Sequence, residues 1–329
     1  MIGYLCREWS EIFRKDSGAK YWSWTRLWVD LGRLPDQAQD LLGFRIIRLV
    51  PEIYIFRAHQ NLIKMFLEFV KKGVTLQLKK LKISNTDPDD IDGIDPGLLT
   101  TVTLKLQDCT IYGADVAQQE AILSGIRDST STSLRHLDMG NEVLQVAPDI
   151  LVGAAMKLER MTVSLSTLQL EAIITMLAAT EDFRLRQLIL HHNIQPVKSL
   201  DPEVVAGALT KLEAVDQNLC LSLSADQFTA LISRICQAPV LRLTKLWIDS
   251  DFISLVPPEV LVGAIQRLEM VVFWWGRMTD EQFTAILTKA KENELGKIKN
   301  IYISSILGMW SVSPSLLEEA KQNKKLTIC

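Results

Sequence analysis

The sequence lacks the features that mark a secreted, membrane-spanning or metal-binding protein. Its five cysteines (Cys6, Cys109, Cys220, Cys236 and Cys329) are odd in number, widely spaced and without a C-x-x-C pair, which argues against a disulfide framework or a zinc site. No uninterrupted apolar run approaches the roughly 18 residues that suggest a membrane span. The N-terminus carries charge too early for a secretory signal. We therefore expect reduced thiols and a cytoplasmic or nuclear location.

An excess of charge and the common catalytic motifs are also missing. The chain has 36 basic and 39 acidic side chains, well mixed, with a net charge of -3, so neither a nucleic acid nor a membrane is the expected partner. No glycine-rich phosphate loop follows a strand, and no G-x-S-x-G is present. His191 and His192 are neighbours on a strand end, so their side chains point opposite ways and do not share one metal. We predict a protein that is not an enzyme and has no cofactor or metal.

What the sequence does contain is an internal repeat. A proline opens a similar block at intervals of 52, 54, 56 and 56 residues: Pro96, Pro148, Pro202, Pro258 and Pro314. Three of these blocks are nearly alike and read P-D-I-L-V-G-A-A-M-K-L-E, P-E-V-V-A-G-A-L-T-K-L-E and P-E-V-L-V-G-A-I-Q-R-L-E. Ten residues after each of the first four prolines, a leucine starts an apolar pattern of period two (Leu106, Leu158, Leu212 and Leu268). This pattern is typical of a short, half-buried strand.

A second unit alternates with the first. It carries Q-x-x-A, with the glutamines at Gln118, Gln169, Gln227 and Gln282, and an L-x-x-L-x-L type of strand follows each time. Each interval therefore holds two strand–helix units of about 27 residues, a length within the range of leucine-rich repeats. Helical HEAT or TPR repeats lack such a strand. We predict an α/β leucine-rich-repeat horseshoe solenoid of about ten units over residues 34–329, with parallel strands on the concave face and helices on the convex face.

Helix-start signals recur in register with the repeat. In one unit a proline in the first turn follows an N-cap residue, Asp95, Asp201 or Ser313. In the other unit the helix opens with a capping box, in which a Ser, Thr or Asp side chain and a glutamine three residues later cap each other. The boxes are Ser166 with Gln169, Ser224 with Gln227, Thr279 with Gln282 and, in looser form, Asp115 with Gln118. The Gly-Ala pairs at Gly153, Gly207 and Gly263 also follow the repeat and are interpreted as helix-packing positions.

The N-terminal segment carries a second motif. Leu5-Cys6-Arg7-Glu8-Trp9-Ser10-Glu11-Ile12-Phe13, followed by Tyr21-Trp22-Ser23-Trp24, resembles the second half of an F-box. F-box proteins of the leucine-rich-repeat class place this helical module before a solenoid. The resemblance implies the substrate-recognition subunit of a Skp–cullin–F-box ubiquitin ligase, with the adaptor bound by Leu5, Cys6, Trp9, Ile12 and Trp22. The opening L-P-x-E/D-x-L helix of the family is absent. Residues 1–33 are thus expected to be a partial F-box-like helical cap, or alternatively a segment that only covers the first repeat.

The exposed strand positions predict where a partner binds. Residues between the buried apolar ones point into the concavity; in the middle of the chain they are small or polar and include Tyr112, His136, Asp138, Thr162, Ser164, His191, Asp216 and Asn218. Near the C-terminus they become aromatic and charged: Lys245, Trp247, Asp249, Met270, Trp274 and Tyr302. Such a composition is typical of an interface hot spot. Alternatively, a register shift of one residue places Trp274 in the core.

We therefore expect a protein–protein interaction scaffold whose concave face holds a protein target, and possibly a Skp-type adaptor at the N-terminus. Two other interpretations stay open. One is a stand-alone leucine-rich-repeat binder or inhibitor with no ligase role. The other is the sensor region of an innate-immunity-type receptor, which would require a nucleotide-binding domain.

Overall fold

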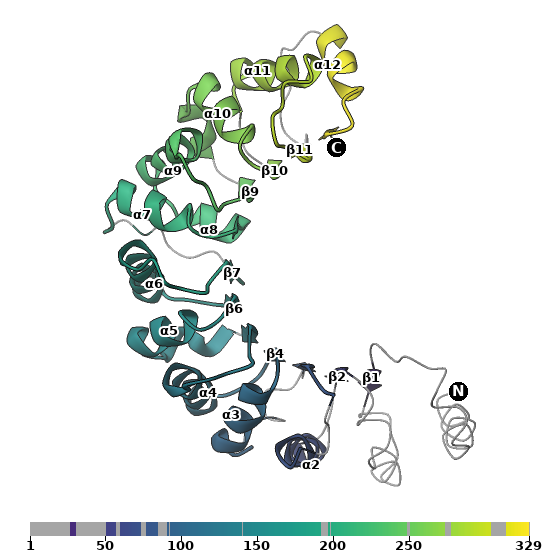
Figure 1. The fold of residues 1–329 in the computed structure, drawn as a ribbon, viewed down its shortest axis with the longest axis vertical. Helices are drawn as coiled ribbons and strands as arrows, with labels where there is room; N and C mark the ends of the chain where they lie inside the picture. Colours follow the sequence, from purple (N-terminus) through teal and green to yellow (C-terminus); the bar gives the residue numbers. More distant parts are fainter. Residues whose placement is uncertain are drawn as a thin grey trace, which may run out of the picture.

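A computed structural model describes residues 27–30, 51–56, 60–73, 77–84, 91, 93–139, 141–191, 197, 199–248, 251–273, 278–303 and 314–328. In these residues the chain forms one parallel sheet of twelve strands, and the order of the strands in the sheet is their order in the sequence (Figure 1). The predicted α/β class with a parallel sheet is confirmed. Of the helices described, none is long and apolar enough to cross a membrane.

The strands are short and regularly spaced along the chain. They are β1 (Leu27–Asp30), β2 (Glu52–Phe56), β3 (Lys80–Ser84), β4 (Asp108–Ile111), β5 (His136–Met139), β6 (Arg160–Val163), β7 (Gln187–Leu190), β8 (Ala214–Val215), β9 (Lys245–Ile248), β10 (Met270–Phe273), β11 (Asn300–Ile303) and β12 (Leu326–Ile328). β1 falls inside residues 1–33, which we expected to be helical, so the sheet begins one strand earlier than expected.

Helices follow the strands from β2 onward. They are α2 (Gln60–Lys71), α3 (Pro96–Lys105), α4 (Val116–Asp128), α5 (Pro148–Ala155), α6 (Thr167–Ala179), α7 (Pro202–Leu209), α8 (Gln217–Leu221), α9 (Ala225–Gln237), α10 (Pro258–Ile265), α11 (Asp280–Lys291) and α12 (Pro314–Lys321), with short 3₁₀ helices η6 (Asn141–Gln145) and η7 (Asp251–Leu255). The predicted prolines open their helices, and Asp95 and Asp201 cap two of them as expected. Ser313 lies outside the described residues.

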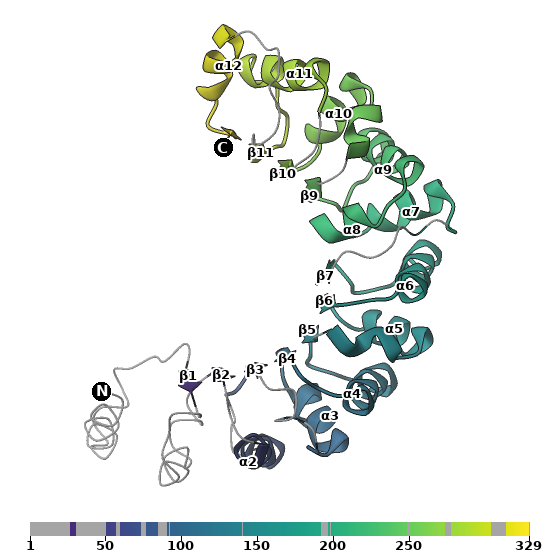
Figure 2. The same ribbon diagram turned by 180° about the vertical axis from the view of Figure 1, so that it is seen from behind.

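The described residues form an open arc with the strands on its inner side and most helices on its outer side (Figures 1 and 2). The short α8 reaches the inner margin between β7 and β9. Neighbouring strands lie about 4.8 Å apart, whereas packed helices need about 8–10 Å between their axes. Because each unit is thicker on its helical side, stacking the units in sequence bends the sheet inward. Among the described residues, the outer helices therefore leave the inner face of the sheet open.

Rows of buried strand side chains, which run from unit to unit, contribute to the core between the sheet and the helices. The strands pair in register, so that one residue of each strand lies beside its counterpart in the next: Leu81, Cys109, Leu137, Met161, Leu188, Val215, Leu246, Val271, Ile301 and Leu326. All of them are buried. Cys109 and Cys220 are buried in this core, and Cys236 is half-buried. Burial raises the pKa of the Cys109 thiol to about 12.

The four glutamines of the capping boxes also join neighbouring units. The Gln169 Oε1 accepts from the Ser166 backbone N–H at 2.8 Å, while its Nε2 donates to the carbonyl oxygens of Val143 (2.9 Å) and Val146 (2.6 Å). The same pair of donated bonds is made by Gln118 to Ile91 and Ile94, by Gln227 to Val197 and Leu200, and by Gln282 to Ile253 and Val256. All four side chains are buried. The sequence predicted the boxes, and Asp115 with Gln118 forms a complete one; the bonds to the preceding unit were not predicted.

The unit that begins at Leu212 departs from the prediction. Asp216 and Asn218 were expected on the concave face of a strand, but β8 ends at Val215 and α8 follows. Asp216 is the N-cap of α8: its carboxylate accepts from the backbone N–H groups of Leu219 (2.9 Å) and Leu190 (3.2 Å). Asn218 donates from its Nδ2 to the Leu190 carbonyl oxygen at 2.6 Å. An aspartate favours a helix start, and here that preference ends the strand after two residues.

Candidate functional site

The inner face of the arc is formed by the strand residues that do not enter the core. Two rows run across it in register. The first contains Glu52, Lys80, Asp108, His136, Arg160, Gln187, Ala214, Lys245, Met270 and Asn300. The second contains Tyr54, Lys82, Thr110, Asp138, Thr162 and Ile189, and then Trp247, Val272, Tyr302 and Thr327. The rows follow the alternation predicted from the sequence, except at β8, which has no residue in the second row.

A polar network lies on the N-terminal half of this face. The Tyr112 hydroxyl, which follows β4, donates to Asp138 Oδ2 at 2.9 Å, and His191 Nε2, which follows β7, lies 3.0 Å from Asp138 Oδ1. The rings of Tyr112 and His191 meet edge to face, with their centroids 6.0 Å apart. Asp138 of β5 therefore joins a side chain that follows β4 to one that follows β7. We call Tyr112, Asp138 and His191 the polar network.

The contact between His191 and Asp138 passes over β6, which lies between β5 and β7 in the sheet. Thr162 and Ser164, which were expected to be exposed in the concavity, are only 6% and 5% exposed. In the sheet, Thr162 lies between Asp138 of β5 and Ile189 of β7. This part of the inner face is consequently a preformed polar surface, and its threonine and serine positions are covered.

Electrostatics within the network set its protonation. The hydrogen bond with Asp138 raises the pKa of His191 above its ordinary value, against the opposing effect of partial burial. Burial, together with the negative charge of Asp138, raises the pKa of Tyr112 to about 12. With a pKa this far above neutral, the Tyr112 hydroxyl keeps its proton at neutral pH. The network suits polar recognition, in which Tyr112 stays a hydrogen-bond donor.

Charged side chains surround the network. Lys82 Nζ lies 5.6 Å from the centroid of the Tyr112 ring, and His136 Nδ1 is 3.4 Å from Asp108 Oδ2. Lys80 and Glu52 form an ion pair at 3.1 Å. A shallow hollow of about 210 Å³ is bordered by Lys80, Lys82, Asp108 and His136, and its lining also includes Tyr54, Thr110, Asp138, Arg160 and Thr162. The hollow offers both donors and acceptors to a ligand.

The predicted aromatic patch lies at the other end of the inner face. Lys245 and Met270 are register partners on β9 and β10, and Val272 lies between Trp247 and Tyr302. Trp247 and Met270 are half-buried, and Tyr302 is 38% exposed. The structure thus brings four of the six predicted residues to one end of the sheet. Asp249 and Trp274, with the alternative register for Trp274, lie outside the described residues.

The predicted adaptor-binding residues Leu5, Cys6, Trp9, Ile12 and Trp22 also lie outside the described residues. The members of the polar network, in contrast, were placed on the concave face by the strand alternation, but their mutual contact was missed. His191 is 53 residues from Asp138, and no local pattern shows that a side chain reaches across an intervening strand. For Asp108 and His136, the sequence predicted equivalent positions on neighbouring strands, but it did not predict their contact.

These observations define the class of protein: an α/β chain with one curved parallel sheet, whose inner face carries a polar half and an aromatic end. Within the residues that the structure describes, no group of three or more His, Cys, Asp or Glu side chains could hold a metal ion. The chain matches no protein-family model and no curated protein sequence.

Proposed function

We propose that the chain is a leucine-rich-repeat solenoid that binds a segment of another protein on its concave face. The observation that carries the proposal is the pair of in-register side-chain rows on the inner side of the open arc (Figure 2). Two strand–helix units per interval of about 54 residues support the leucine-rich-repeat assignment. A horseshoe of this kind presents an extended surface, and such surfaces bind extended partners.

The two ends of the face offer different chemistry. Trp247 and Tyr302 supply aromatic area, Met270 adds an adaptable apolar side chain, and Lys245 lies at the edge of the patch. Aromatic side chains of this kind dominate binding free energy at interfaces. Trp274 and Asp249 are proposed members of the same patch. The polar network would fix the orientation of the partner, because its donors and acceptors are already held in place.

The proposal is tested by affinity capture with the intact chain followed by direct binding measurements with the captured protein. The variant Trp247→Ala/Tyr302→Ala is expected to weaken binding at least tenfold, since each aromatic hot-spot residue contributes about 1 kcal/mol or more. A matched control is Leu168→Ala/Leu255→Ala, which truncates two exposed leucines (71% and 60% exposed) that lie in α6 and η7, away from the sheet. Equal binding by both variants would argue against the aromatic patch.

We further propose that this binding serves substrate recognition in a Skp–cullin–F-box ubiquitin ligase, with the stand-alone binder or inhibitor as the alternative. The support is the resemblance of Leu5 to Ile12, followed by Trp22, to the second half of an F-box. The test mixes the purified chain with a purified Skp-type adaptor and follows co-elution by size-exclusion chromatography. Co-elution that Trp9→Ala/Trp22→Ala abolishes supports the ligase role. Separate elution of the intact chain and the adaptor favours the stand-alone binder.

A further inference from the structure

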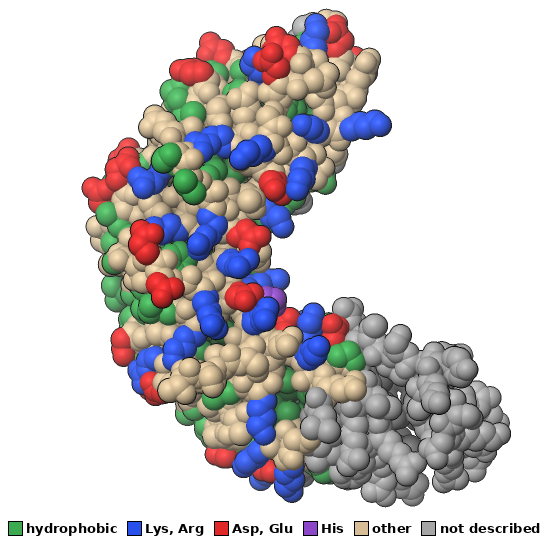
Figure 3. Space-filling model, in the orientation of Figure 1, with side chains coloured by type: hydrophobic (Ala, Val, Ile, Leu, Met, Phe, Trp, Pro, Cys, Tyr) green, Lys and Arg blue, Asp and Glu red, His purple; other side chains and the backbone are tan. Residues whose placement is uncertain are grey.

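A file of basic residues runs along one flank of the arc, separate from the concave face. The residue just before each strand belongs to a hydrogen-bonded row (Gln107, Arg135, Glu159, Arg186, Glu213, Thr244, Glu269 and Lys299), in which backbone N–H groups donate to the carbonyl of the preceding unit. Two residues before each member of that row the chain has a basic residue, except at Ser133. We call these residues the basic file: Lys105, Lys157, Arg184, Lys211, Arg242, Arg267 and Lys297. Figure 3 shows Lys and Arg gathered along this flank, with fewer Asp and Glu between them.

Every second member of the basic file has a structural role. Lys211 Nζ donates to the carbonyl oxygens of Leu177 (2.9 Å), Ala178 and Thr180 (both 3.1 Å) at the end of α6. Lys105, Lys157 and Arg267 reach the C-terminal carbonyls of α2, α4 and α9 in the same way. The last carbonyls of a helix lack intrahelical partners and attract positive charge. These four cations therefore cap the helix of the preceding unit.

The other members of the file have no such role. Arg184, Arg242 and Lys297 make no ion pair or side-chain hydrogen bond with any residue that the structure describes. Arg184 and Arg242 are exposed, and the Arg242 guanidinium lies 5.6 Å from the centroid of the Phe183 ring. Arg186, beside them in the hydrogen-bonded row, is also exposed and unpaired among the described residues. Helix capping does not explain these arginines.

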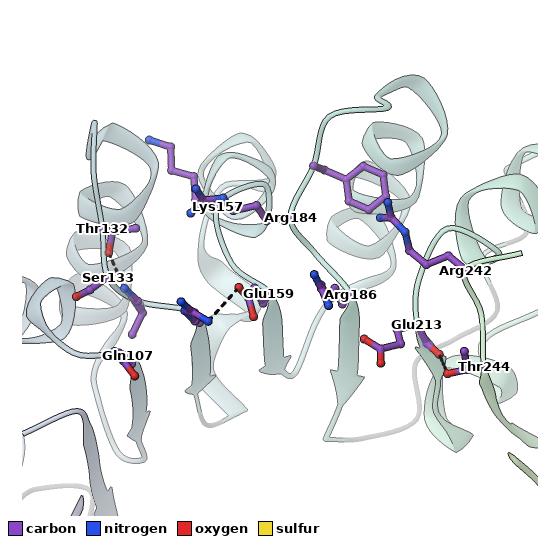
Figure 4. A pocket seen from close by; sticks show the side chains of 13 residues that line it. Gln107, Thr132, Ser133, Lys157, Glu159, Arg184, Arg186, Glu213, Arg242 and Thr244 are labelled. Atoms are coloured by element: carbon purple, nitrogen blue, oxygen red, sulfur yellow. Dashed lines mark hydrogen bonds and ion pairs between the residues drawn. The ribbon is translucent and has the colours of Figure 1, made fainter. Parts of the chain in front are cut away.

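The unpaired arginines line a hollow of about 810 Å³ (Figure 4). Its charged lining consists of Arg135, Lys157, Arg184, Arg186 and Arg242 with only two carboxylates, Glu159 and Glu213. Arg135 is partly neutralised, because its Nη1 lies 3.8 Å from Glu159 Oε1. Gln107, Thr132, Ser133 and Thr244 add neutral polar groups. The hollow is positive, polar and of a size typical of ligand pockets.

We propose that this hollow binds an acidic, extended segment of a partner protein, whose carboxylates pair with Arg184 and Arg242. These arginines precede β7 and β9, two strand steps or about 10 Å apart. A peptide in the extended polyproline II conformation advances about 3.1 Å per residue and returns to the same face every third residue, so acidic side chains three residues apart match this spacing. A nucleic acid fits less well, because Glu159 and Glu213 in the hydrogen-bonded row repel a continuous line of phosphates. The proposal concerns a different surface from the concave face and does not depend on what binds there.

The experiment uses the full chain and a fluorescent 12-residue peptide with Glu at every third position among Ser and Gly, followed by fluorescence anisotropy. The variant Arg184→Glu/Arg242→Glu is expected to weaken binding more than tenfold. Lys64→Glu/Lys324→Glu is the control, because it changes the net charge by the same amount at two exposed lysines. Lys64 lies in α2 and Lys324 lies just before β12. Equal melting temperatures establish that the variants fold. Should the first variant melt lower, Arg184→Gln/Arg186→Gln replaces it, since neither side chain has a partner among the described residues.

Binding that is lost in the arginine variant and kept in the lysine control supports the proposal. Equal losses in both variants, or no binding by the unmodified chain at low salt, overturn it, since attraction between exposed charges is strongest there. The third arm is a single-stranded 12-mer oligonucleotide. Tighter binding of this oligonucleotide than of the peptide, through the same arginines, would identify a nucleic-acid surface and overturn the assignment to an acidic peptide.

Discussion

Gln169 donates a 2.6 Å hydrogen bond from its Nε2 to the carbonyl oxygen of Val146, one repeat unit earlier. The same amide donates to Val143 and accepts from the Ser166 backbone, so a single buried side chain joins a helix start to the preceding unit. Glutamine can do this because its amide has donors and an acceptor at its two ends. A glutamate would keep the capping box but lose the donors.

Gln169→Glu is therefore expected to lower the free energy of unfolding by about 1–3 kcal/mol, the cost of leaving buried acceptors without a donor. Urea denaturation followed by circular dichroism measures the change. Gln187→Glu provides a matched control on the inner face of β7, where the side chain is half-exposed. Similar losses in the two variants would show that the bonds to Val143 and Val146 contribute little.

The equivalent glycines of two helices differ in the space around them. A Cβ at Gly263 would lie 2.6 Å from Cys236 Sγ, whereas at Gly207 the nearest atom is 3.7 Å away. Gly207→Ala should be neutral or stabilising by up to about 1 kcal/mol, because alanine favours a helix. Gly263→Ala should destabilise by about 1–3 kcal/mol through overpacking, and Cys236→Ala should relieve that loss. Thermal denaturation of the three variants checks the order, and a stable Gly263→Ala would contradict it.

Asp216 predicts an unusual dependence of stability on pH. Burial raises the pKa of this carboxyl to about 6, despite the backbone N–H groups that favour its charged form. Since the folded pKa lies above the unfolded value near 3.9, the native state holds the proton more tightly. The protonated Asp216 carboxyl contributes its whole stabilisation of the fold below about pH 4, and this contribution is lost as pH rises through about 6.

Asp216→Asn keeps an oxygen for the helix cap and removes the buried charge. The variant is expected to gain about 1–3 kcal/mol of stability at pH 7.5 and to gain little at pH 4. Urea denaturation at the two pH values checks this. A gain of the same size at both values would mean that ionisation of Asp216 is not the cause.

The His191 side chain should titrate above the ordinary range of histidine, because its hydrogen bond to Asp138 stabilises the charged imidazole. Its pKa is raised on folding, so the pair stabilises the protein below the unfolded value near 6.5, and that contribution is lost as pH rises through the folded value. NMR titration of the imidazole measures the pKa directly. Asp138→Asn should lower it, while Asp149→Asn, at the start of α5, should not.

Some of these features could be predicted from the sequence and others could not. The prolines, the capping boxes and the apolar period of two depend on neighbouring residues, and they located the helices and most strands. Leu212 carried the same apolar spacing, yet Asp216 capped a helix there because a local preference for a helix start competed with the strand pattern. The contact of His191 with Asp138 and the bonds from Gln169 depend on residues in different units. Such contacts follow from stacking, which a single unit does not encode.

The two kinds of junction alternate strictly along the arc. A glutamine connects one unit to the unit before it, and a capping lysine or arginine connects the next. The building block is consequently a pair of units, not a single one. Removing residues 148–201 would place Pro202 after Ala147, so that Lys211 faces the end of α4 and Gln227 faces Val143 and Val146. Such a chain could grow or shrink by whole pairs through gene duplication or deletion without creating a junction of a new type.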